Sequence, residues 1–243
     1  MSSKSTFVEA CNQNDEEELI AQREFLNQIT NLKTSILLEI GSGFGELALQ
    51  LQPFAKKIYL SEINREKQLW LARYCLINKF ENIEIILNKL QNYSKNLFVD
   101  LVYSFNTFSF LSNRQLSTIL KTAYSLLKPG GYLVFGHLQS SIDNNLKNNS
   151  EEFKNSQNGI NVNQKIKVSK IGRNKVQIRY RNVISQYDLR NQFNYKKIIY
   201  PRKVDSILNQ KSVAKFSSAH VYKNVNFEEY SQEDSSYILV LQK

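Results

Sequence analysis

The chain has 243 residues, 42% of them hydrophobic, and a formal net charge of +10, which is enough for one sizeable α/β domain with a subdomain grafted on. No run approaches the roughly 18 consecutive apolar residues of a membrane helix, and the polar start of the chain does not resemble a secretion signal. Because Cys11 lies in that polar start and Cys75 in a helical pattern, neither suggests a disulfide framework or a metal cluster, and we expect a soluble, cytoplasmic protein without a metal site.

Strands and helices alternate along the first 140 residues. The pattern predicts strands at 35–40, 57–63, 82–90, 97–105 and 132–138, and helices at 15–32, 46–54, 64–80 and 114–127, with a turn at 127–131. The run at 35–40 is apolar throughout, which is typical of a central parallel strand covered on both faces. The alternation therefore predicts right-handed crossovers and a doubly wound, mostly parallel α/β sheet, with ligands at the carboxyl ends of its strands.

The pattern changes after Gln139. Residues 140–163 are polar and rich in asparagine, and we expect a mobile loop or a partly disordered connection there. From 165 to 200, apolar and charged residues alternate with period two between turn signals, which predicts antiparallel strands with one solvated face. A short helix at 201–209 and strands at 215–224 and 236–243 follow, and the two strands are expected to rejoin the main sheet as an antiparallel pair.

A glycine-rich turn follows the first predicted strand, in the sequence LLEIGSGFGE at 37–46. The dinucleotide fingerprint has the spacing G-x-G-x-x-G and holds a pyrophosphate. Here the third glycine, Gly45, comes one residue early, and Glu39 and Glu46 bracket the loop. Negative charge at this place repels a pyrophosphate and favours a cation, such as a sulfonium–ammonium ligand. Glu62, at the end of the second strand, is placed to accept hydrogen bonds from both hydroxyls of a ribose.

Five segments in register carry a resemblance to a known family. They are LLEIGSGFGE, YLSEIN, ILNKLQNY, FVDLVYSFNTFSFLS and LLKPGGYLVFG, spread over residues 35–140. In this order and spacing the chain resembles the class I, Rossmann-like S-adenosylmethionine-dependent methyltransferases of the small-molecule type. The resemblance implies a seven-stranded sheet with an antiparallel lid inserted between strands five and six, and S-adenosylmethionine as the cofactor.

The resemblance also implies a set of cofactor residues. Around the methionine moiety these are Glu39, Gly41, Ser42, Gly43 and Gly45. Glu62 would bind the ribose and Ile63 would lie against the adenine, with Asn88, Lys89 and Leu90 at the adenine edge. Ser104, Phe105 and Asn106 would lie beneath the sulfonium, where Asn106 would face the acceptor. Many family members have aspartate at the position of Asn88, whose amide can still accept a hydrogen bond from the exocyclic amine of adenine.

A catalytic base is needed only where the acceptor must lose a proton. His137, just past the fifth predicted strand, is the candidate for a base or an acceptor-orienting group; a hydrogen-bonded rim residue is the alternative. His220 is expected to be structural. The sequence SFNT at 104–107 replaces the Asn-Pro-Pro-Tyr type of tetrapeptide, and Cys75 lies in a predicted helix, which argues against base-flipping amino-methyltransferases and pyrimidine-carbon methyltransferases.

The positive charge is concentrated near the predicted lid. Between Lys147 and Lys215 there are 16 Lys and Arg residues against 4 Asp and Glu residues, which suggests an acidic partner or, alternatively, a solvated strand face. Small-molecule methyltransferases carry such a lid over the acceptor site, often as a dimer surface. We therefore expect a small acceptor with a phosphate or carboxylate, such as a nucleotide-linked sugar, and a homodimer through the lid. Tyr180, Tyr187 and Tyr195 are candidates to line the acceptor site, with packing between lid and sheet as the alternative.

Four parts and one function summarise these expectations. The parts are a helical segment (1–34), a cofactor-binding core (35–140), a polar loop with a basic lid (141–200), and a last helix with an antiparallel strand pair (201–243). The expected function is methyl transfer to an N or O atom of the acceptor by in-line displacement. An RNA methyltransferase that grips the backbone with its lid, and a non-catalytic partner subunit of the same fold, stay open as alternatives.

Overall fold

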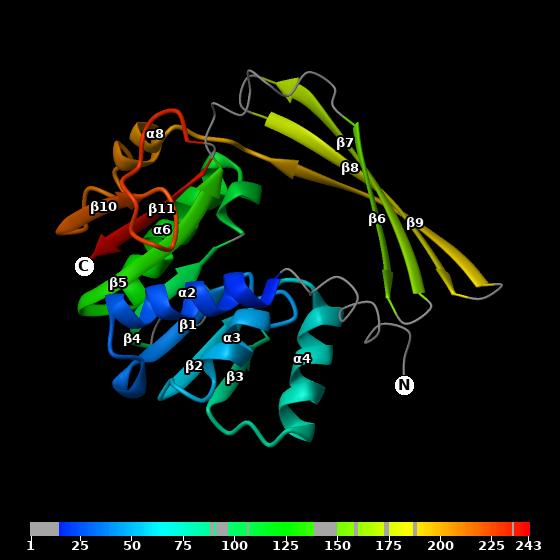
Figure 1. Ribbon diagram of the computed structural model, residues 1–243. Helices are drawn as coiled ribbons and strands as arrows, with labels where there is room; N and C mark the ends of the chain where they lie inside the picture. Colours follow the sequence, from blue (N-terminus) through cyan, green and yellow to red (C-terminus); the bar gives the residue numbers. More distant parts are fainter. Residues whose placement is uncertain are drawn as a thin grey trace.

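Two separate β-sheets organise the protein (Figure 1). The computed structural model describes residues 15–87, 90, 97–105, 107–138, 150–157, 160–172, 175–186, 189–234 and 236–243. One sheet has seven strands in the order β10-β11-β5-β4-β1-β2-β3, and the other has four strands in the order β6-β7-β8-β9. No helix within these residues is long and apolar enough to cross a membrane.

The seven-stranded sheet is mostly parallel. Its strands are β1 (Ile36–Ile40), β2 (Lys57–Ser61), β3 (Ile83–Ile86), β4 (Val99–Ser104), β5 (Leu127–Leu138), β10 (Ser218–Tyr222) and β11 (Ser236–Gln242). The first five pair in parallel, whereas β11 is antiparallel to both β5 and β10. This confirms the predicted doubly wound sheet and its closing antiparallel pair. The turn expected at 127–131 instead belongs to β5, where the register with β4 shifts between Val99 and Leu101.

Helices cover both faces of this sheet. They are α2 (Asp15–Ile29), α3 (Glu46–Leu51), α4 (Arg65–Ile77), α6 (Asn113–Leu126) and α8 (Val204–Leu208), with two short 3₁₀ helices, η1 (Leu32–Thr34) and η2 (Phe108–Phe110). Buried side chains of α2, α3 and α4 pack on one face, and those of α6 and α8 pack on the other. Because successive strand residues point to opposite faces, Leu37 and Leu38 of β1 enter different core clusters. The continuous apolar run of β1 follows from this two-sided cover.

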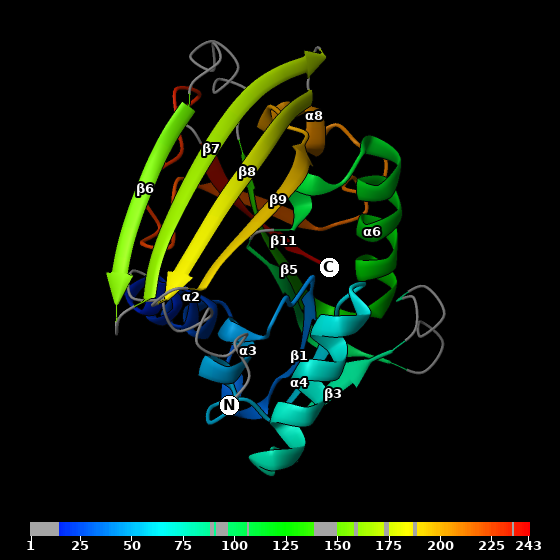
Figure 2. The ribbon, with the colours of Figure 1, turned by 90° about the vertical axis from the view of Figure 1, so that its right-hand side faces the viewer.

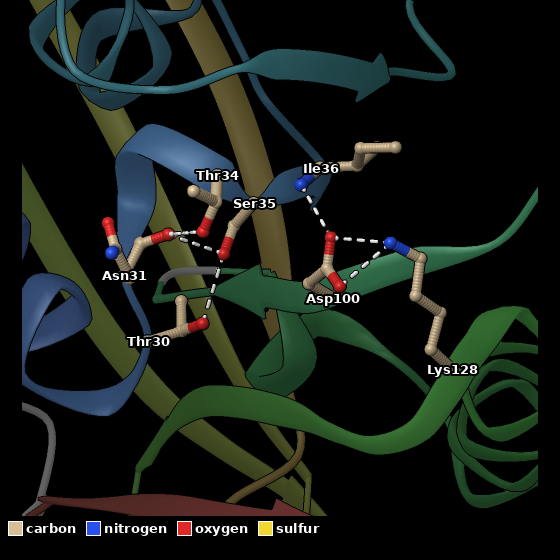
Figure 3. A network of polar contacts seen from close by, with 7 residues as sticks. All are labelled: Thr30, Asn31, Thr34, Ser35, Ile36, Asp100 and Lys128. Carbon is tan, nitrogen blue, oxygen red and sulfur yellow. Dashed lines mark hydrogen bonds and ion pairs between the residues drawn. The ribbon is translucent and has the colours of Figure 1, made fainter.

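At the amino ends of the parallel strands, one carboxylate holds three strands together (Figure 3). Asp100, near the start of β4, accepts a hydrogen bond from the backbone N–H of Ile36 at 2.7 Å. It also pairs with Lys128 of β5, whose Nζ lies 2.8 Å from Oδ1. Asp100 therefore ties the amino ends of β1, β4 and β5. Beside it, Ser35 donates to the carbonyl of Asn31 at 2.7 Å, which closes the turn from α2 into β1.

The four-stranded sheet, here called the lid, comes between β5 and β10 in the chain, which confirms the predicted insertion. Its strands are β6 (Ser150–Gln157), β7 (Ile160–Gly172), β8 (Lys175–Gln186) and β9 (Leu189–Ile199), all antiparallel to their neighbours. The prediction of a loop at 140–163 is wrong for β6 and for the first residues of β7. Asn158 and Gly159 stand between these strands in the sequence, and this dipeptide is a strong signal for a two-residue hairpin.

Candidate active site

A cavity of about 1320 Å³ lies at the carboxyl ends of β1 to β4. Its wall includes the residues at or just after these strand ends, together with residues of α2, α4 and α6. The lid contributes Lys197 and Ile198 of β9 to the same wall. The cavity therefore lies where open α/β sheets bind their ligands, and the core and the lid both line it.

The glycine loop is held by backbone hydrogen bonds and by close packing. Gly41 has a φ of +74°, and a Cβ there would lie only 1.9 Å from Oγ1 of Thr107. Its N–H donates to the carbonyl of Ser61 at the end of β2, at 2.7 Å. Gly45 caps α3 with a φ of +81°, and a Cβ there would lie 2.8 Å from Leu71. The outer glycines thus let the loop pass close to η2 and let α3 pack against α4.

Glu62 fastens this loop from the neighbouring strand end. One carboxylate oxygen accepts the N–H of Gly43 at 2.9 Å, and the other accepts the N–H of Asn64 at 2.7 Å. A carboxylate offers about four acceptor sites, so Glu62 keeps capacity for two further donors on the cavity side. The side chain of Gln68 donates to the backbone carbonyl of Glu62 and fixes its position.

Glu39 is a buried carboxyl in the cavity wall, with 8% of its surface exposed. The hydroxyl of Tyr103 donates to it at 3.2 Å. Burial raises the pKa of Glu39 to about 8, and the nearby carboxylates of Glu46 and Glu62 raise it as well, against a lowering by the Tyr103 hydrogen bond. A cation placed here would restore the ionised form, because an opposite charge offsets both the burial and the repulsion.

Two serine hydroxyls in the cavity wall have no partner among the described residues. Ser42 and Ser104 are 3% and 2% exposed, and the Oγ atom of each is buried without a hydrogen bond. A buried polar atom normally has a partner, so these hydroxyls mark places for polar atoms of a ligand. Ile63 and Leu87, which are 98% and 67% exposed, offer apolar surface in the same wall. Carboxylates, free hydroxyls and apolar side chains together fit a cationic nucleoside such as S-adenosylmethionine.

Most of the predicted cofactor residues line this one cavity. They are Glu39, Gly41, Ser42, Gly43, Glu62, Ile63, Leu90, Ser104 and Phe105. Gly45 does not belong to the wall and serves the packing of α3 instead. Asn88 and Lys89 lie outside the described residues.

His137, the predicted catalytic residue, is not part of the cavity wall. It is 3% exposed and stacks on Tyr237 with ring centroids 5.6 Å apart. Nη1 of Arg202 lies 2.9 Å from its Nε2, and Oγ of Ser109 lies 3.4 Å from its Nδ1. Because the guanidinium can only donate, Nε2 must accept and the ring proton sits on Nδ1. Both ring nitrogens are thus engaged inside the core.

Arg202 joins the lid to the core from a buried position. Besides His137 it donates to Asn113 at 2.9 Å, to the carbonyl of Tyr200 at 3.0 Å and to the carbonyl of Leu111. All of these acceptors are uncharged, and burial lowers the pKa of the guanidinium. The network lies where β9 returns to the core, so it fixes the direction in which the lid leaves the sheet.

The acceptor residues predicted in the lid and after β4 are only partly described. Asn106 and Tyr187 lie outside the described residues, and of Tyr180 only the place of its backbone in β8 is described. Tyr195 is 42% exposed and does not line the cavity; its ring lies 6.0 Å from Nζ of Lys197.

Two lysines of the cavity wall were missed from the sequence. Lys67 extends from α4, with Nζ 5.1 Å from the ring of Phe44, and Lys197 extends from β9, with Nζ 5.2 Å from the ring of Phe110. Burial lowers the pKa of Lys197, and so does repulsion from Lys67. Both ammonium groups thus belong to residues that line the same cavity. Period-two alternation places either Lys196 or Lys197 on the inner face of the strand, and only the packed structure selects Lys197.

Other missed residues come from helices. Glu18, Leu19 and Gln22 of α2 enter the wall, and so do Phe110, Leu111, Gln115 and Ile119 at η2 and α6. In the sequence these residues belong to ordinary helical patterns. The sequence carries no signal that separates them from core or surface positions.

Comparisons with known proteins agree with this geometry. A family model described as a methyltransferase domain matches residues 12–170. No curated protein sequence matches the chain significantly. A solved S-adenosylmethionine-dependent methyltransferase from Clostridium acetobutylicum is similar to this chain, with 13% identity, 99% of each chain covered and a TM-score of 0.80.

Two further solved structures are named for the sugars on which the proteins act. KedS8, a sugar N-methyltransferase from Streptoalloteichus, has 12% identity, covers 100% of this chain and 94% of its own, and has a TM-score of 0.76. CalS10, an amino pentose methyltransferase from Micromonospora echinaspora with bound S-adenosylmethionine, has 12% identity, covers 99% and 97%, and has a TM-score of 0.73. At these identities the likeness shows the fold, and the family match covers well over half of the chain. The chain therefore belongs to the methyltransferase-domain family and is a class I, S-adenosylmethionine-dependent methyltransferase.

Proposed function

We propose that this methyltransferase acts on an amine of a small acceptor that carries a phosphate or carboxylate, such as a nucleotide-linked sugar. One observation carries the proposal: Lys67 and Lys197 line the same cavity as Glu39 and Glu62. The carboxylates favour a cationic cofactor, whereas the lysines favour an anionic group. One cavity thus offers separate places for two ligands of opposite charge.

The cavity has room for both ligands. At about 1320 Å³ it exceeds the roughly 300 to 1,000 Å³ usual for one small-molecule pocket. The glycine loop, Glu62 and Ile63 form the part next to β1 and β2, where the ribose and adenine would lie. Phe110 and Lys197 form the part beneath the lid, where the acceptor would lie.

The named residues would work mainly by positioning. S-adenosylmethionine supplies an activated methyl group on a sulfonium with a good leaving group. Glu62 would hold the ribose through charged hydrogen bonds, and Glu39 would neutralise the cationic end of the cofactor. The free hydroxyls of Ser42 and Ser104 would complete polar contacts in the same wall. Lys67 and Lys197 would orient the acceptor so that its nucleophile lies in line with the methyl group.

The placement of His137 supports an amine rather than a hydroxyl acceptor. A hydroxyl needs a base near the transferred methyl group, and both nitrogens of His137 are engaged away from the cavity. An amine can be delivered neutral and needs no base. The lysines support this further, because a positive surrounding disfavours a protonated amine. KedS8 and CalS10, named for a sugar N-methyltransferase and an amino pentose methyltransferase, are consistent with this proposal.

Acceptor trials with methyl-labelled cofactor test the proposal. We expect labelled product from nucleotide-linked or phosphorylated amino sugars and little from the same sugars without phosphate. Lys197→Met should raise KM for the anionic acceptor about tenfold or more and leave cofactor affinity unchanged, because a charge-assisted contact contributes about 1.5 to 3 kcal/mol. Lys196→Met, one residue away on the opposite strand face, is the matched control. Equal use of neutral and anionic acceptors would refute the assignment of the anion site.

Three further expectations remain proposals alongside this one. They are the homodimer through the lid, the cytoplasmic location and the division at residues 34, 140 and 200. RNA as the methyl acceptor is less well supported than a small molecule, because five described cations of the lid are on the strand face that does not carry Lys197. They are Lys165, Lys167, Arg179, Arg181 and Lys196.

A further inference from the structure

The lid has a basic face on the side opposite to the cavity. The side chain of Lys197 reaches toward the core, with Nζ 5.2 Å from the ring of Phe110 in the cavity wall. Its neighbour Lys196 lies on the other face of β9, because successive strand residues alternate between faces. Lys196 pairs in register with Arg179 of β8, which pairs with Lys167 of β7. These three cations share one sheet face and are all exposed. We call this surface, with the adjacent Lys165 and Arg181, the outer lid face.

This surface brings like charges together. Lys167, Arg179 and Lys196 are direct cross-strand neighbours, with Ser150 at the β6 end of the row. Like charges directly opposite each other destabilise a sheet. In the next row Lys165 lies opposite Arg181, and Glu152 is the β6 partner in register. Among the described residues, no carboxylate forms an ion pair with these five cations. An anionic partner would remove the repulsion.

The arginines on this face are held in place by neutral side chains. Nε of Arg179 donates to Gln177 at 2.7 Å, and Nη2 of Arg181 donates to Gln192 at 3.2 Å. Each guanidinium keeps further N–H groups for an outside acceptor, and its planar fork matches phosphate oxygens. Along β7 and along β8 the cations are two residues apart, which is about 6.7 Å. An extended polyphosphate backbone presents its charges at a comparable spacing.

The arrangement and charge of the surface select among anionic partners. Figure 2 shows the four lid strands side by side, so that the register-paired cations of neighbouring strands form rows across the sheet. A flexible single strand can place its phosphates along such rows. A second copy of the chain docked by this face about a two-fold axis would bring the cationic row against itself.

We propose that the outer lid face binds single-stranded RNA through its phosphates. The inference goes beyond methyl transfer and does not depend on it, because the surface lies on the other side of the lid from the cavity. The contacts involve lysine and arginine rather than base edges or stacking rings. Binding is therefore independent of base sequence and falls steeply with salt.

Fluorescence anisotropy of the full-length protein with labelled oligouridylate tests this inference. The triple variant Lys167→Gln, Arg179→Gln and Lys196→Gln should lower the slope of log K against log salt by about 2, since each lost phosphate contact on a single strand contributes about 0.7. The control triple variant, Lys33→Gln, Lys121→Gln and Lys211→Gln, removes three exposed lysines outside the lid. It lowers the net charge by the same amount as the first triple variant and should leave the slope unchanged. Unaltered affinity for S-adenosylmethionine in both triple variants verifies that they fold.

A second pair of variants tests which face of β9 binds the RNA. Lys196→Gln should weaken RNA binding, whereas Lys197→Gln, on the inner face, should not. Equal losses in the two triple variants, or an effect of Lys197→Gln as large as that of Lys196→Gln, overturn the proposal. Binding of polyglutamate or of phosphatidylserine vesicles as strong as that of RNA at the same salt overturns it as well, in favour of an acidic protein or a lipid surface.

Discussion

The hydroxyl of Tyr103 donates a hydrogen bond of 3.2 Å to the buried carboxyl of Glu39, its register partner on the neighbouring parallel strand. The contact holds the acidic side chain of Glu39 in a buried position near the end of β1, next to the glycine loop. Burial raises the pKa of Tyr103 as well, and the negative charge of Glu39 adds to this effect. With its pKa raised to about 8, the carboxyl of Glu39 is mainly protonated at neutral pH in the absence of a nearby cation.

Glu39 predicts a pH dependence of stability. Its pKa is raised from 4.5 to about 8 in the folded protein, so between these pH values the folded state holds a proton that the unfolded state has lost. The free energy of unfolding should therefore fall as pH rises through this window, by up to about 1.4 kcal/mol per pH unit, and level off above it. Glu39→Gln, which can still accept from Tyr103, should remove this contribution. Urea unfolding of both proteins across the window measures the difference; parallel curves would contradict it.

The same carboxyl predicts proton release on cofactor binding. A cationic ligand beside Glu39 favours the ionised form and lowers its pKa. Binding of S-adenosylmethionine near neutral pH should therefore release close to one proton. Calorimetry in buffers of different ionisation enthalpy measures this release, and Glu39→Gln should abolish it. Equal proton release by the variant would place the titrating group elsewhere.

Gly41 should be intolerant of a side chain. Gly41→Ala strains a φ of +74° and drives Cβ to 1.9 Å from Thr107. Gly130→Ala is a matched control, because its φ is +77° and no atom lies within 4 Å of the added Cβ. The control should lose about 1 to 2 kcal/mol of stability from the backbone alone. Gly41→Ala should lose more and should also lose cofactor binding, as thermal unfolding and calorimetry would report. Similar losses in both variants would argue against the collision.

Glu62 should contribute to cofactor affinity in two ways, by holding Gly43 and Asn64 and by accepting from the ribose. Glu62→Ala should weaken binding of S-adenosylmethionine by about 1.5 to 3 kcal/mol, which is typical of lost charge-assisted hydrogen bonds. Glu81→Ala, which removes an exposed acid of the same half of the chain, serves as the control. A dissociation constant unchanged by Glu62→Ala would refute the ribose assignment.

His137 should matter for stability rather than for proton transfer. His137→Asn deprives Arg202 of an acceptor inside the core, and an unsatisfied buried donor costs about 1 to 3 kcal/mol. The pH profile of kcat should keep its shape in the variant. His220→Asn, at an exposed position of β10, should change neither quantity. A stable His137→Asn protein with altered pH dependence of kcat would restore the catalytic assignment.

Local patterns predicted the core of the fold because its elements are periodic and its signals are contiguous. The apolar run of β1, the strongly periodic α4 and the alternation of strand and helix all appear in single segments of the sequence. The strand β6 was missed because SEEFKNSQ has no apolar alternation, and its pairing with β7 supplies what the segment lacks. Pairing of this kind depends on a partner strand, which overrides the local propensity.

The residues expected to bind the methyl donor could likewise be predicted from local sequence patterns, whereas the residues expected to bind the acceptor could not. LLEIGSGFGE and Glu62 lie at successive strand ends, so parallel pairing brings them together at one edge of the sheet. Lys67 and Lys197 are far apart in the sequence, and they line one cavity only because β9 of the lid runs back to the core. The distribution of basic residues along the chain was misleading for the same reason. The sequence shows how many charges the lid carries, whereas only the strand register shows on which face of the lid each charge lies.

By itself, the sequence determined the fold class, the cofactor loop and the basic character of the inserted strands, since each depends on neighbouring residues and their periodicity. Only the tertiary structure decided which lysine enters the cavity, that His137 turns into the core, and that the described cations of the outer lid face lie on the strand face opposite to Lys197. These outcomes depend on how elements distant in the chain pack together. A one-residue change of register moves every side chain of a strand to the other face, and composition does not record that choice.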